Sequence, residues 1–437
     1  MAIRFLDKKT HSFYYTDNGK EKILKLIFGD EVETLPGEAS KGPRYTRVRF
    51  RNRTGQWKTP PLSKQRPLEM YFLDVGQGDA AFFVTPEGKK ILVDGGLKTQ
   101  ALHFLIWRYR LDKPGQKVKI DHLILSHADK DHVEGLIPLL KHPRVTVDQI
   151  WHNGIGLFAK EQGFNEPIGQ VTGGRLLTLH NGLDDLQGMA LADTPGAVFK
   201  DWIEAVGESG AAYGRLDRSM GQLDIGDPTL QFEITSPILE SDNTFRWFAN
   251  KAHTINGHSL TFRLTYKRVR TFFSGDLNIE GGDYLCDVPG GPLSVNSHIF
   301  KTPHHGSHEF SNRLLSAVNP MLSVVSSGEI PDHGHPRANF LGRIGAVSRG
   351  PEPLLFSTAM AALFQDADEA PDDDGLTTLE DLDVVNTPSD NVSARKRFKK
   401  TLNGIINVRT DGNTFYAFRR VQQKYQWESY GPIKPIN

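Results

Sequence analysis

The sequence predicts an α+β fold in which β-sheets are covered by helices, with a small β-rich appendage at the N-terminal end. Two observations predict it. After residue 67, short apolar segments alternate with amphipathic helical stretches over roughly 350 residues. Before residue 68, basic and apolar residues alternate and then give way to a linker punctuated by Pro60, Pro61 and Pro67. We therefore expect two parts, residues 1–67 and residues 68–437.

The appendage is distinguished by its charge. Residues 41–68 contain nine basic residues and no acidic one. Around Arg47 and Arg49 the basic residues alternate with apolar ones, which places a cationic row on one face of a strand. This row predicts a surface that follows a phosphate backbone, with Trp57 available to stack on a base. The alternative is an edge strand that its charge protects from aggregation.

The elements of the main part follow from apolar runs bounded by turn residues. The expected strands are residues 71–75, 81–84, 90–93, 121–125, 230–235, 259–266, 270–273, 298–302, 322–325, 354–357, 405–409 and 414–418, and the expected helices are 100–111 and 132–141. Residues 155–225 are Gly-rich, with helical apolar spacing at 176–191 and 197–206, and we expect a largely helical insertion that roofs a site. Residues 362–400 are acidic and rich in Pro, Asp, Ser and Asn, which predicts a flexible loop.

Composition narrows the class of protein. Lys and Arg total 52, as do Asp and Glu, so a uniformly basic coat for nucleic acid is excluded. The zero net charge is, however, a sum of local excesses, because the basic appendage is offset by nine acids in residues 365–383. The single cysteine, Cys286, excludes an internal disulfide framework. No run approaches the roughly 18 apolar residues that span a bilayer, so we expect a cytoplasmic protein without membrane contact.

The densest cluster of chemically active residues is the run SHADKDH at residues 126–132, directly after an apolar strand. Its two imidazoles and two carboxylates lie where the chain turns from the strand into a helix, and they can converge on one or two cations. These residues are His127, Asp129, Asp131 and His132. The alternative is a solvated segment in which an aspartate caps the helix.

Two later strands end in residues of the same kind. Asp276 follows strand 270–273 at a glycine turn, and His304 and His305 follow strand 298–302. Adjacent side chains at a strand end point in different directions. We therefore expect one of the two histidines to bind a metal, and the other to contact substrate or donate a proton.

Taken together, these segments resemble the metallo-β-lactamase-fold hydrolases, in particular the branch that contains the hydrolase domain of the DNA-uptake competence channel protein. The motifs that carry the resemblance are FLDVGQGDA at 72–80, LVDGG at 92–96, SHADKDH at 126–132, SGD at 274–276, HHGS at 304–307, GHP at 334–336 and residues 407–412. They occur in the order that the family shows. The resemblance implies a four-layer αββα sandwich with the site at one edge of its two sheets.

The resemblance also implies roles for individual residues. His127, Asp129, Asp131 and His132 would be metal ligands, Asp276 would bridge two metals, and His304 or His305 would be the ligand from the later strand. Asp94 would orient a ligand imidazole or its loop. Most members have histidine at the positions of Asp129 and Asn256, so one metal would be held more weakly here, with His253 or His258 as an alternative ligand.

The ligand set bears on the metal and on the reaction. Three carboxylates and about three imidazoles suit two Zn²⁺ ions, and the additional carboxylate shifts the preference toward Mn²⁺. Such ions supply a hydroxide nucleophile at neutral pH and neutralise the oxygens of a phosphodiester. Asp131 or Asp129 would hold the water, and His335 or the histidine of the 304–305 pair that is not a ligand would protonate the leaving oxygen. Ser307 and Arg337 would bind the substrate.

Three functions remain open at this point. The first is a metal-dependent phosphodiesterase or nuclease that acts on DNA or on a nucleotide-derived substrate. The second keeps the metals but acts on a small molecule, such as a phosphate ester, a cyclic nucleotide or a lactone. The third is a component of a bacterial defence or toxin-type assembly, in which residues 362–400 dock on a protein partner with a basic surface.

Overall fold

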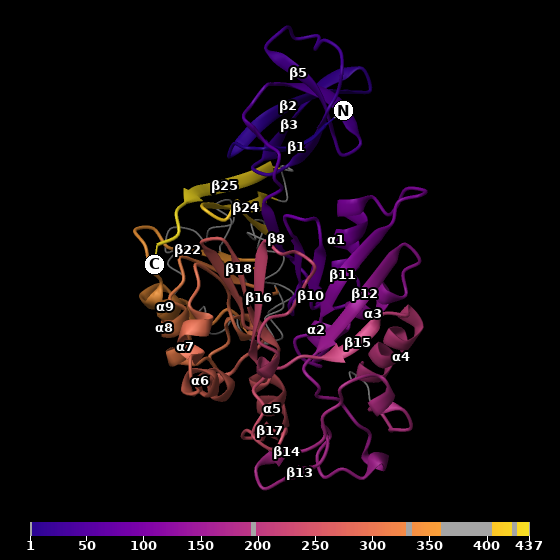
Figure 1. The fold of residues 1–437 in the computed structure, drawn as a ribbon, viewed down its shortest axis with the longest axis vertical. Helices are drawn as coiled ribbons and strands as arrows, with labels where there is room; N and C mark the ends of the chain where they lie inside the picture. Colours follow the sequence, from indigo (N-terminus) through magenta and orange to yellow (C-terminus); the bar gives the residue numbers. More distant parts are fainter. Residues whose placement is uncertain (1, 194–197, 329–333, 360–403, 422–425, 437) are drawn as a thin grey trace, which may run out of the picture.

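The structure, a computed structural model, describes residues 2–193, 198–328, 334–359, 404–421 and 426–436. Two large sheets lie face to face, and helices cover their outer faces, which gives the four layers of an αββα sandwich (Figure 1). The expected fold class is therefore confirmed. The acidic segment 362–400, the basic residues 395–400 and the acids counted in 365–383 lie outside the described residues.

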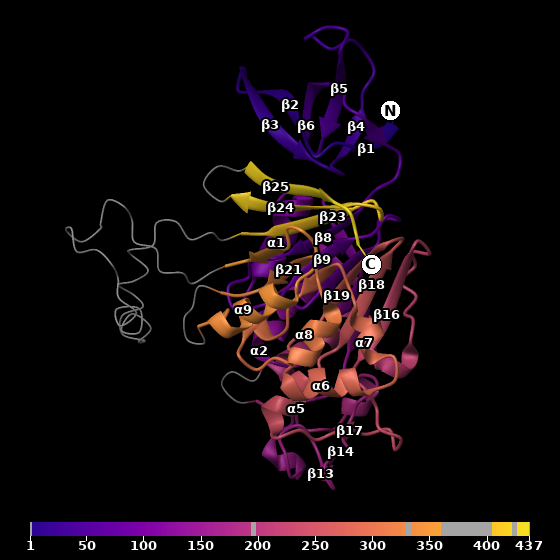
Figure 2. The same cartoon turned by 90° about the vertical axis from the view of Figure 1, so that its left-hand side faces the viewer.

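The first sheet has nine strands. In spatial order they are β15 (Ala212–Arg215), β12 (Val145–His152), β11 (Val118–Ile124), β10 (Lys90–Val93), β9 (Ala81–Val84), β8 (Leu68–Phe72), β23 (Ile406–Thr410), β24 (Phe415–Val421) and β25 (Gln426–Ile433). Its outer face is covered by α1 (Gln100–Tyr109), α3 (Leu136–Leu140) and α4 (Phe199–Ser209). The C-terminal strands complete this sheet beside the appendage (Figure 2).

The second sheet has six strands. In spatial order they are β16 (Leu230–Ser236), β18 (Thr261–Tyr266), β19 (Val269–Phe273), β20 (Ile299–Lys301), β21 (Leu322–Val325) and β22 (Leu354–Ser357). Its outer face packs on α6 (Ile279–Asp287), α7 (Gly291–Val295), α8 (Asn312–Val318) and α9 (Ala338–Val347). Burial on both faces explains why a strand such as Ala81–Val84 is apolar throughout, and four expected strands match the observed bounds at both ends.

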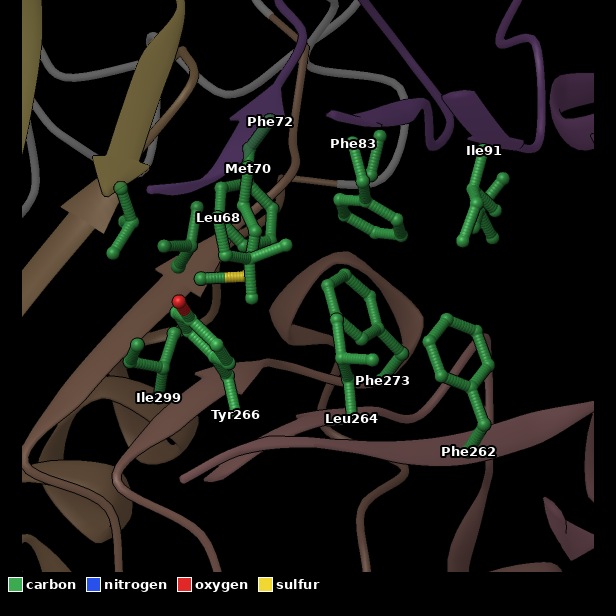
Figure 3. Packing of buried hydrophobic residues seen from close by; sticks show 14 of the residues in the cluster. Leu68, Met70, Phe72, Phe83, Ile91, Phe262, Leu264, Tyr266, Phe273 and Ile299 are labelled. Carbon is green, nitrogen blue, oxygen red and sulfur yellow. The ribbon is translucent and has the colours of Figure 1, made fainter. Parts of the chain in front are cut away.

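The main core lies between the two sheets (Figure 3). Phe83 of the first sheet packs against Phe273 of the second, with ring centroids 4.9 Å apart, and Phe72 stacks on the same ring at 5.7 Å. Phe262 extends the cluster. Because this core joins the sheets over their length, the strand ends that carry the ligand-type residues are held in fixed positions relative to one another.

The appendage is a separate seven-stranded sheet with its own small core. In spatial order its strands are β3 (Lys20–Ile27), β2 (Thr10–Asp17), β6 (Arg53–Lys58), β5 (Tyr45–Phe50), β4 (Glu31–Thr34), β1 (Ala2–Leu6) and β7 (Leu62–Ser63). In β5 the alternation is as expected, with Arg47 and Arg49 exposed. Trp57 corrects the sequence-based expectation, because it is fully buried in the appendage core and cannot stack on a base.

Two helical expectations are wrong. Residues 132–141 do not form one helix, because the chain leaves α2 (Lys130–Val133) and bends at Gly135, whose N–H donates to Gly96 O over 2.9 Å before α3 begins. Among the described residues of 155–225, the helical spacing expected at 197–206 is confirmed by α4, but the segment 176–191 is irregular apart from a 3-10 turn at Asp184–Leu186. The short strands β13 (Val171–Thr172) and β14 (Arg175–Leu176) pair with each other, and β14 also pairs with β17 (Phe245–Arg246), which precedes α5 (Lys251–Gly257).

Candidate metal centre

The ligand-type residues gather where four strands end. β10 and β11 run parallel in the first sheet, and β19 and β20 run parallel in the second. The carboxyl ends of parallel neighbours meet at one edge of a sheet, so the segments that follow these strands lie together. The structure therefore brings these residues together at one edge of the two sheets.

His127, His132 and Asp276 form one group of potential ligands. One ligand atom from each lies within 4.8 Å of the other two, and all three side chains are buried. His132 Nε2 is 3.3 Å from Asp276 Oδ2, and the two imidazole rings lie 4.0 Å apart between centroids. The loop after β11 and the turn after β19 thus contribute to the same position from opposite sheets.

A second group contains Asp131, His132 and His305. His305 Nε2 lies 3.1 Å from Asp276 Oδ2 and 3.3 Å from Asp131 Oδ2. Asp276 consequently contacts a histidine of each group, as a carboxylate between two cations would. This arrangement brings together five of the seven residues that the sequence nominated as ligands.

Within the described part of the chain, buried ligand-type atoms without hydrogen-bond partners indicate that this cluster fits a divalent cation. His127 Nε2, His132 Nε2, His305 Nε2 and Asp276 Oδ1 are buried and have no hydrogen-bond partner among the described residues. Unpaired buried polar atoms are costly, and native structures almost always satisfy them. Imidazole nitrogens and carboxylate oxygens at such distances are the ligand types that Zn²⁺ takes, with carboxylates also suiting Mn²⁺.

Hydrogen bonds behind the site turn each imidazole so that Nε2 faces inward. His132 Nδ1 lies 2.9 Å from Asp94 Oδ2, His127 Nδ1 lies 2.9 Å from Ser126 Oγ, and His305 Nδ1 lies 3.0 Å from Ser326 O. Asp94 also accepts from Ser126 N and Ser126 Oγ, each over 2.7 Å. Partners of this kind fix the tautomer and orientation of metal-binding histidines.

The electrostatics of the cluster separate its histidines. Burial lowers the pKa of His132 and of His305, but the carboxylates beside them, Asp276 foremost, outweigh burial and raise both pKa values well above 6.5. Burial and the neighbouring His132 instead lower the pKa of His127 to about 3. Without a cation, His132 and His305 therefore hold protons in the place that a metal would occupy.

Several nominated residues lie outside these groups. Asp129 Oδ2 is 3.7 Å from His127 Nε2, and its side chain remains 39% exposed, so it lies at the rim. His304 belongs to neither group; its ring centroid is 5.9 Å from that of His335, which lies 6.3 Å from His305. Ser307 is buried and accepts from Glu309 N over 3.2 Å, while Arg337 is exposed ahead of α9.

The two alternative histidines do not join the cluster. His258 is stacked between Phe245 and Phe248, and its Nε2 lies 2.7 Å from Arg246 O. His253 pairs instead with Glu280, with Nδ1 2.7 Å from Oε1. Asn256 is buried, and its Oδ1 has no hydrogen-bond partner in the described part of the chain.

Sequence reasoning missed a buried ion pair beside the centre. Lys301 Nζ contacts Asp79 Oδ2 and donates to Thr302 O over 2.8 Å, and Asp79 Oδ1 lies 3.3 Å from His305 Nδ1. Asp79 also forms a third group of potential ligands with Asp276 and His305. The sequence does contain a sign of this ion pair, namely a lysine that ends the otherwise apolar strand Ile299–Lys301. Buried lysines are almost always paired.

The fold and the histidine and aspartate cluster define the class of this protein. The chain belongs to the Metallo-beta-lactamase superfamily, whose family model matches residues 73–321, and it is a hydrolase of that superfamily. ComE operon protein 3 of Bacillus subtilis (strain 168) is 25% identical over 298 residues, which are 64% of this chain and 31% of that protein. The chain thus corresponds to less than a third of the length of that relative.

Two solved structures illustrate the structural likeness. Metallo-beta-lactamase SMB-1 is 14% identical, and the alignment covers 54% of this chain and 76% of that protein with a TM-score of 0.29. A putative zn-dependent hydrolase of the superfamily from Thermotoga maritima is 9% identical, covers 66% of this chain and 98% of its own, and also has a TM-score of 0.29. Among the described residues, no helix combines the length and apolar character needed to cross a membrane.

Proposed function

We propose that the chain is a metal-dependent phosphodiesterase that cleaves DNA or a nucleotide-derived substrate. The observation that carries the proposal is the contact of Asp276 with both His132 and His305, at 3.3 and 3.1 Å. A carboxylate in that position suits two neighbouring cations. Two such cations would supply an activated water and would neutralise the oxygens of a phosphodiester.

The surrounding residues have distinct parts in the proposed reaction. Of the two carboxylates that contact His305, Asp131 lies nearer to solvent, since its side chain is 20% exposed while that of Asp276 is 4% exposed. It would orient the attacking water. His304, which lies outside both ligand groups, and His335 beside it would deliver the proton to the leaving oxygen.

The resemblance to the competence branch and the alignment with ComE operon protein 3 support a nucleic-acid or nucleotide substrate. The basic face of the appendage gives less support for such a substrate than its composition suggests. Arg49 pairs with Glu33 at 2.7 Å and Lys41 with Glu21 at 2.8 Å, so part of that face is already neutralised. The metal centre, rather than the appendage, carries the proposal.

The test begins with the metal content of the purified protein. Linear and circular DNA, RNA, cyclic nucleotides and a chromogenic phosphodiester are then assayed with the wild type and with Asp131→Asn. We expect at least one phosphodiester to be cleaved and the substitution to remove at least 99% of that activity, about 2.7 kcal/mol of transition-state stabilisation.

The matched control is Asp148→Asn, because Asp148 is an exposed carboxylate that pairs with Lys119. It should leave activity unchanged. Equal activity in wild type and Asp131→Asn would show a contaminating enzyme, and a metal-loaded protein that cleaves none of these substrates would refute the proposal. A salt titration identifies the substrate class, since polymer binding weakens steeply with salt and binding of a small ester does not.

A further inference from the structure

A cluster of basic side chains lies where the appendage meets the hydrolase part. A cavity of about 210 Å³ is lined by four basic side chains that come from four separate segments. These residues are Arg51 from the turn after β5, Arg66 from the linker, Lys90 from the start of β10 and Arg108 from the last turn of α1. Phe50 and Tyr109 contribute aromatic walls.

Each acidic residue that lines this cavity already pairs with an arginine. Asp30 binds Arg409 Nη1 over 2.9 Å, and Glu31 pairs with Arg66. Among the described residues, neither Arg51 nor Lys90 forms an ion pair. Their charge is consequently available to an anion that enters the cavity.

The pKa values of Arg51 and Lys90 are consistent with a place for an anion in this cavity. Burial and the neighbouring Arg108 lower the pKa of Arg51 to about 10. Burial also lowers the pKa of Lys90, and Arg66 and Arg108 add to that effect against the opposing charge of Asp121. The loss of hydration is the larger cause at both positions, so an anion that pairs with Arg51 or Lys90 in the cavity would offset that loss.

We propose that this cavity binds a small anion that carries two or more phosphate groups, such as pyrophosphate or a nucleoside diphosphate. Arginine and lysine are the residues that recognise phosphate oxygens, and several charges on a small anion match several fixed cations. An adjoining cavity of about 560 Å³ shares Arg66 and Gly88 with the first and contains Lys64, Lys267 and Tyr266. It offers room for a nucleoside beside the phosphates.

This cavity is separate from the metal centre. Lys90 begins β10 and Asp94 follows its last residue, so the two lie about 13 Å apart along the strand. A ligand at Lys90 therefore cannot be the ester under attack. It would instead bind simultaneously to the appendage and to the hydrolase part, which makes the site suited to an effector.

The experiment is isothermal titration of the full-length protein with pyrophosphate and with ADP. The variants are Arg51→Asn, which tolerates the positive φ of 52°, and Lys90→Gln. Each should weaken binding about tenfold, and the double variant should weaken it further, because each removes one charged contact. Tighter binding of ADP than of pyrophosphate would assign the adjoining cavity to a nucleoside, and equal binding would assign the site to the diphosphate alone.

Controls separate this site from the metal centre and from general charge effects. Lys117→Gln removes an exposed cation outside the cavity and should leave the affinity unchanged. Removal of metal by chelation and dialysis should also leave it unchanged. The proposal is overturned if the wild type shows no saturable binding, if both variants bind like the wild type, or if binding disappears with the metal. It is equally overturned if an oligonucleotide binds through Arg51 and Lys90 while both small anions do not.

Discussion

His132 and Asp94 are held together by a bond of 2.9 Å between Nδ1 and Oδ2, while Nε2 of the same ring faces Asp276 at 3.3 Å. The carboxylate of Asp94 is buried, and its backbone has a positive φ of 56°. Because asparagine tolerates that conformation, Asp94→Asn removes the charge without forcing the backbone to move. The imidazole then loses the charged acceptor that orients it, because the amide keeps only one of the two carboxylate oxygens.

We predict that Asp94→Asn weakens metal affinity by about 10- to 100-fold, the usual effect of losing such a partner. Competition with a chromogenic chelator measures it. Asp148→Asn, at an exposed carboxylate, is the control and should bind metal like the wild type. Unchanged affinity in Asp94→Asn would show that packing alone orients the ring of His132.

The pH dependence of stability should differ between the metal-free and metal-loaded protein. In the metal-free protein the pKa values of His132 and His305 are raised by the carboxylates around them, Asp276 foremost, against the effect of burial. A raised pKa contributes stability below the unfolded value of about 6.5, and that stability is lost as the pH rises toward the folded value. A cation needs these protons to leave, so it binds better as the pH rises.

The stabilisation by metal should accordingly increase as the pH rises from about 6.5 toward the raised pKa values of His132 and His305. Thermal unfolding with metal and after its removal, at several pH values, gives this difference directly. A difference in Tm that stays constant across that range would contradict the proposed competition between protons and the cation at His132 and His305.

The sequence predicts much of the clustering of these side chains because the residues concerned are close together in the chain or lie at strand ends. The run at 126–132 supplies three of the five clustered side chains, and each of the others directly follows an apolar strand. Strands such as Ala81–Val84 are equally local, since apolar runs bounded by turn residues define them. Local composition is sufficient wherever a strand leads straight into the site.

Features that depend on distant partners escape sequence reasoning. Lys301 and Asp79 are separated by more than 200 residues, and only the fold brings them into contact. Trp57 is expected from the sequence to stack on a base beside the cationic row, yet the small appendage needs its volume as core. The apolar spacing at 197–206 does form α4, but the similar spacing at 176–191 does not form a helix, and Gly188, at φ 76°, turns the chain there.

Gly78 and Gly76 provide a matched test of the loop that supports Asp131. Both have positive φ, 99° and 73°, so alanine is strained at either position. A Cβ at Gly78 would lie 1.9 Å from Asp131 O, whereas a Cβ at Gly76 would meet no atom within 4 Å. We expect Gly78→Ala to displace Asp131 and to lose most metal binding, while Gly76→Ala retains it. Metal content after dialysis measures both, and equal loss would mean that backbone strain, not the clash, is responsible.

Arg409 should contribute strongly to the stability of the whole chain. It is buried, and it binds Phe28 O at 2.7 Å, Asp30 at 2.9 Å and Tyr71 Oη at 3.0 Å, so it joins the appendage to the first sheet. Arg409→Met leaves the buried carboxylate of Asp30 without its ion-pair partner and should lower the free energy of unfolding by about 3–5 kcal/mol.

Arg419→Met is the control for Arg409→Met. Arg419 pairs at 2.6 Å with Glu428, whose side chain is 41% exposed, and a pair of this kind contributes at most about 1 kcal/mol. Urea denaturation of both variants gives the comparison. Similar losses in the two variants would show that the buried network around Arg409 contributes no more than a surface pair.

The neighbouring histidines His304 and His305 should separate metal binding from proton transfer. His305 Nε2 lies 3.1 Å from Asp276 and its ring is fixed by Ser326 O, whereas His304 belongs to no group of potential ligands and faces His335. We predict that His305→Asn loses metal together with activity. His304→Asn should keep its metal and lower kcat by about 100-fold, within the range for removal of a general acid.

The pH profile makes the second half of this prediction specific. Burial lowers the pKa of His304, so its protonated form is scarce at neutral pH, and the basic limb of the profile, where the rate falls as the pH rises, reports on its deprotonation. That limb should disappear in His304→Asn, and a substrate with a good leaving group, which needs no proton, should restore most of the rate. Loss of metal in His304→Asn, or an equal defect on both substrates, would make His304 a supporting residue of the metal centre and leave His335 as the proton donor.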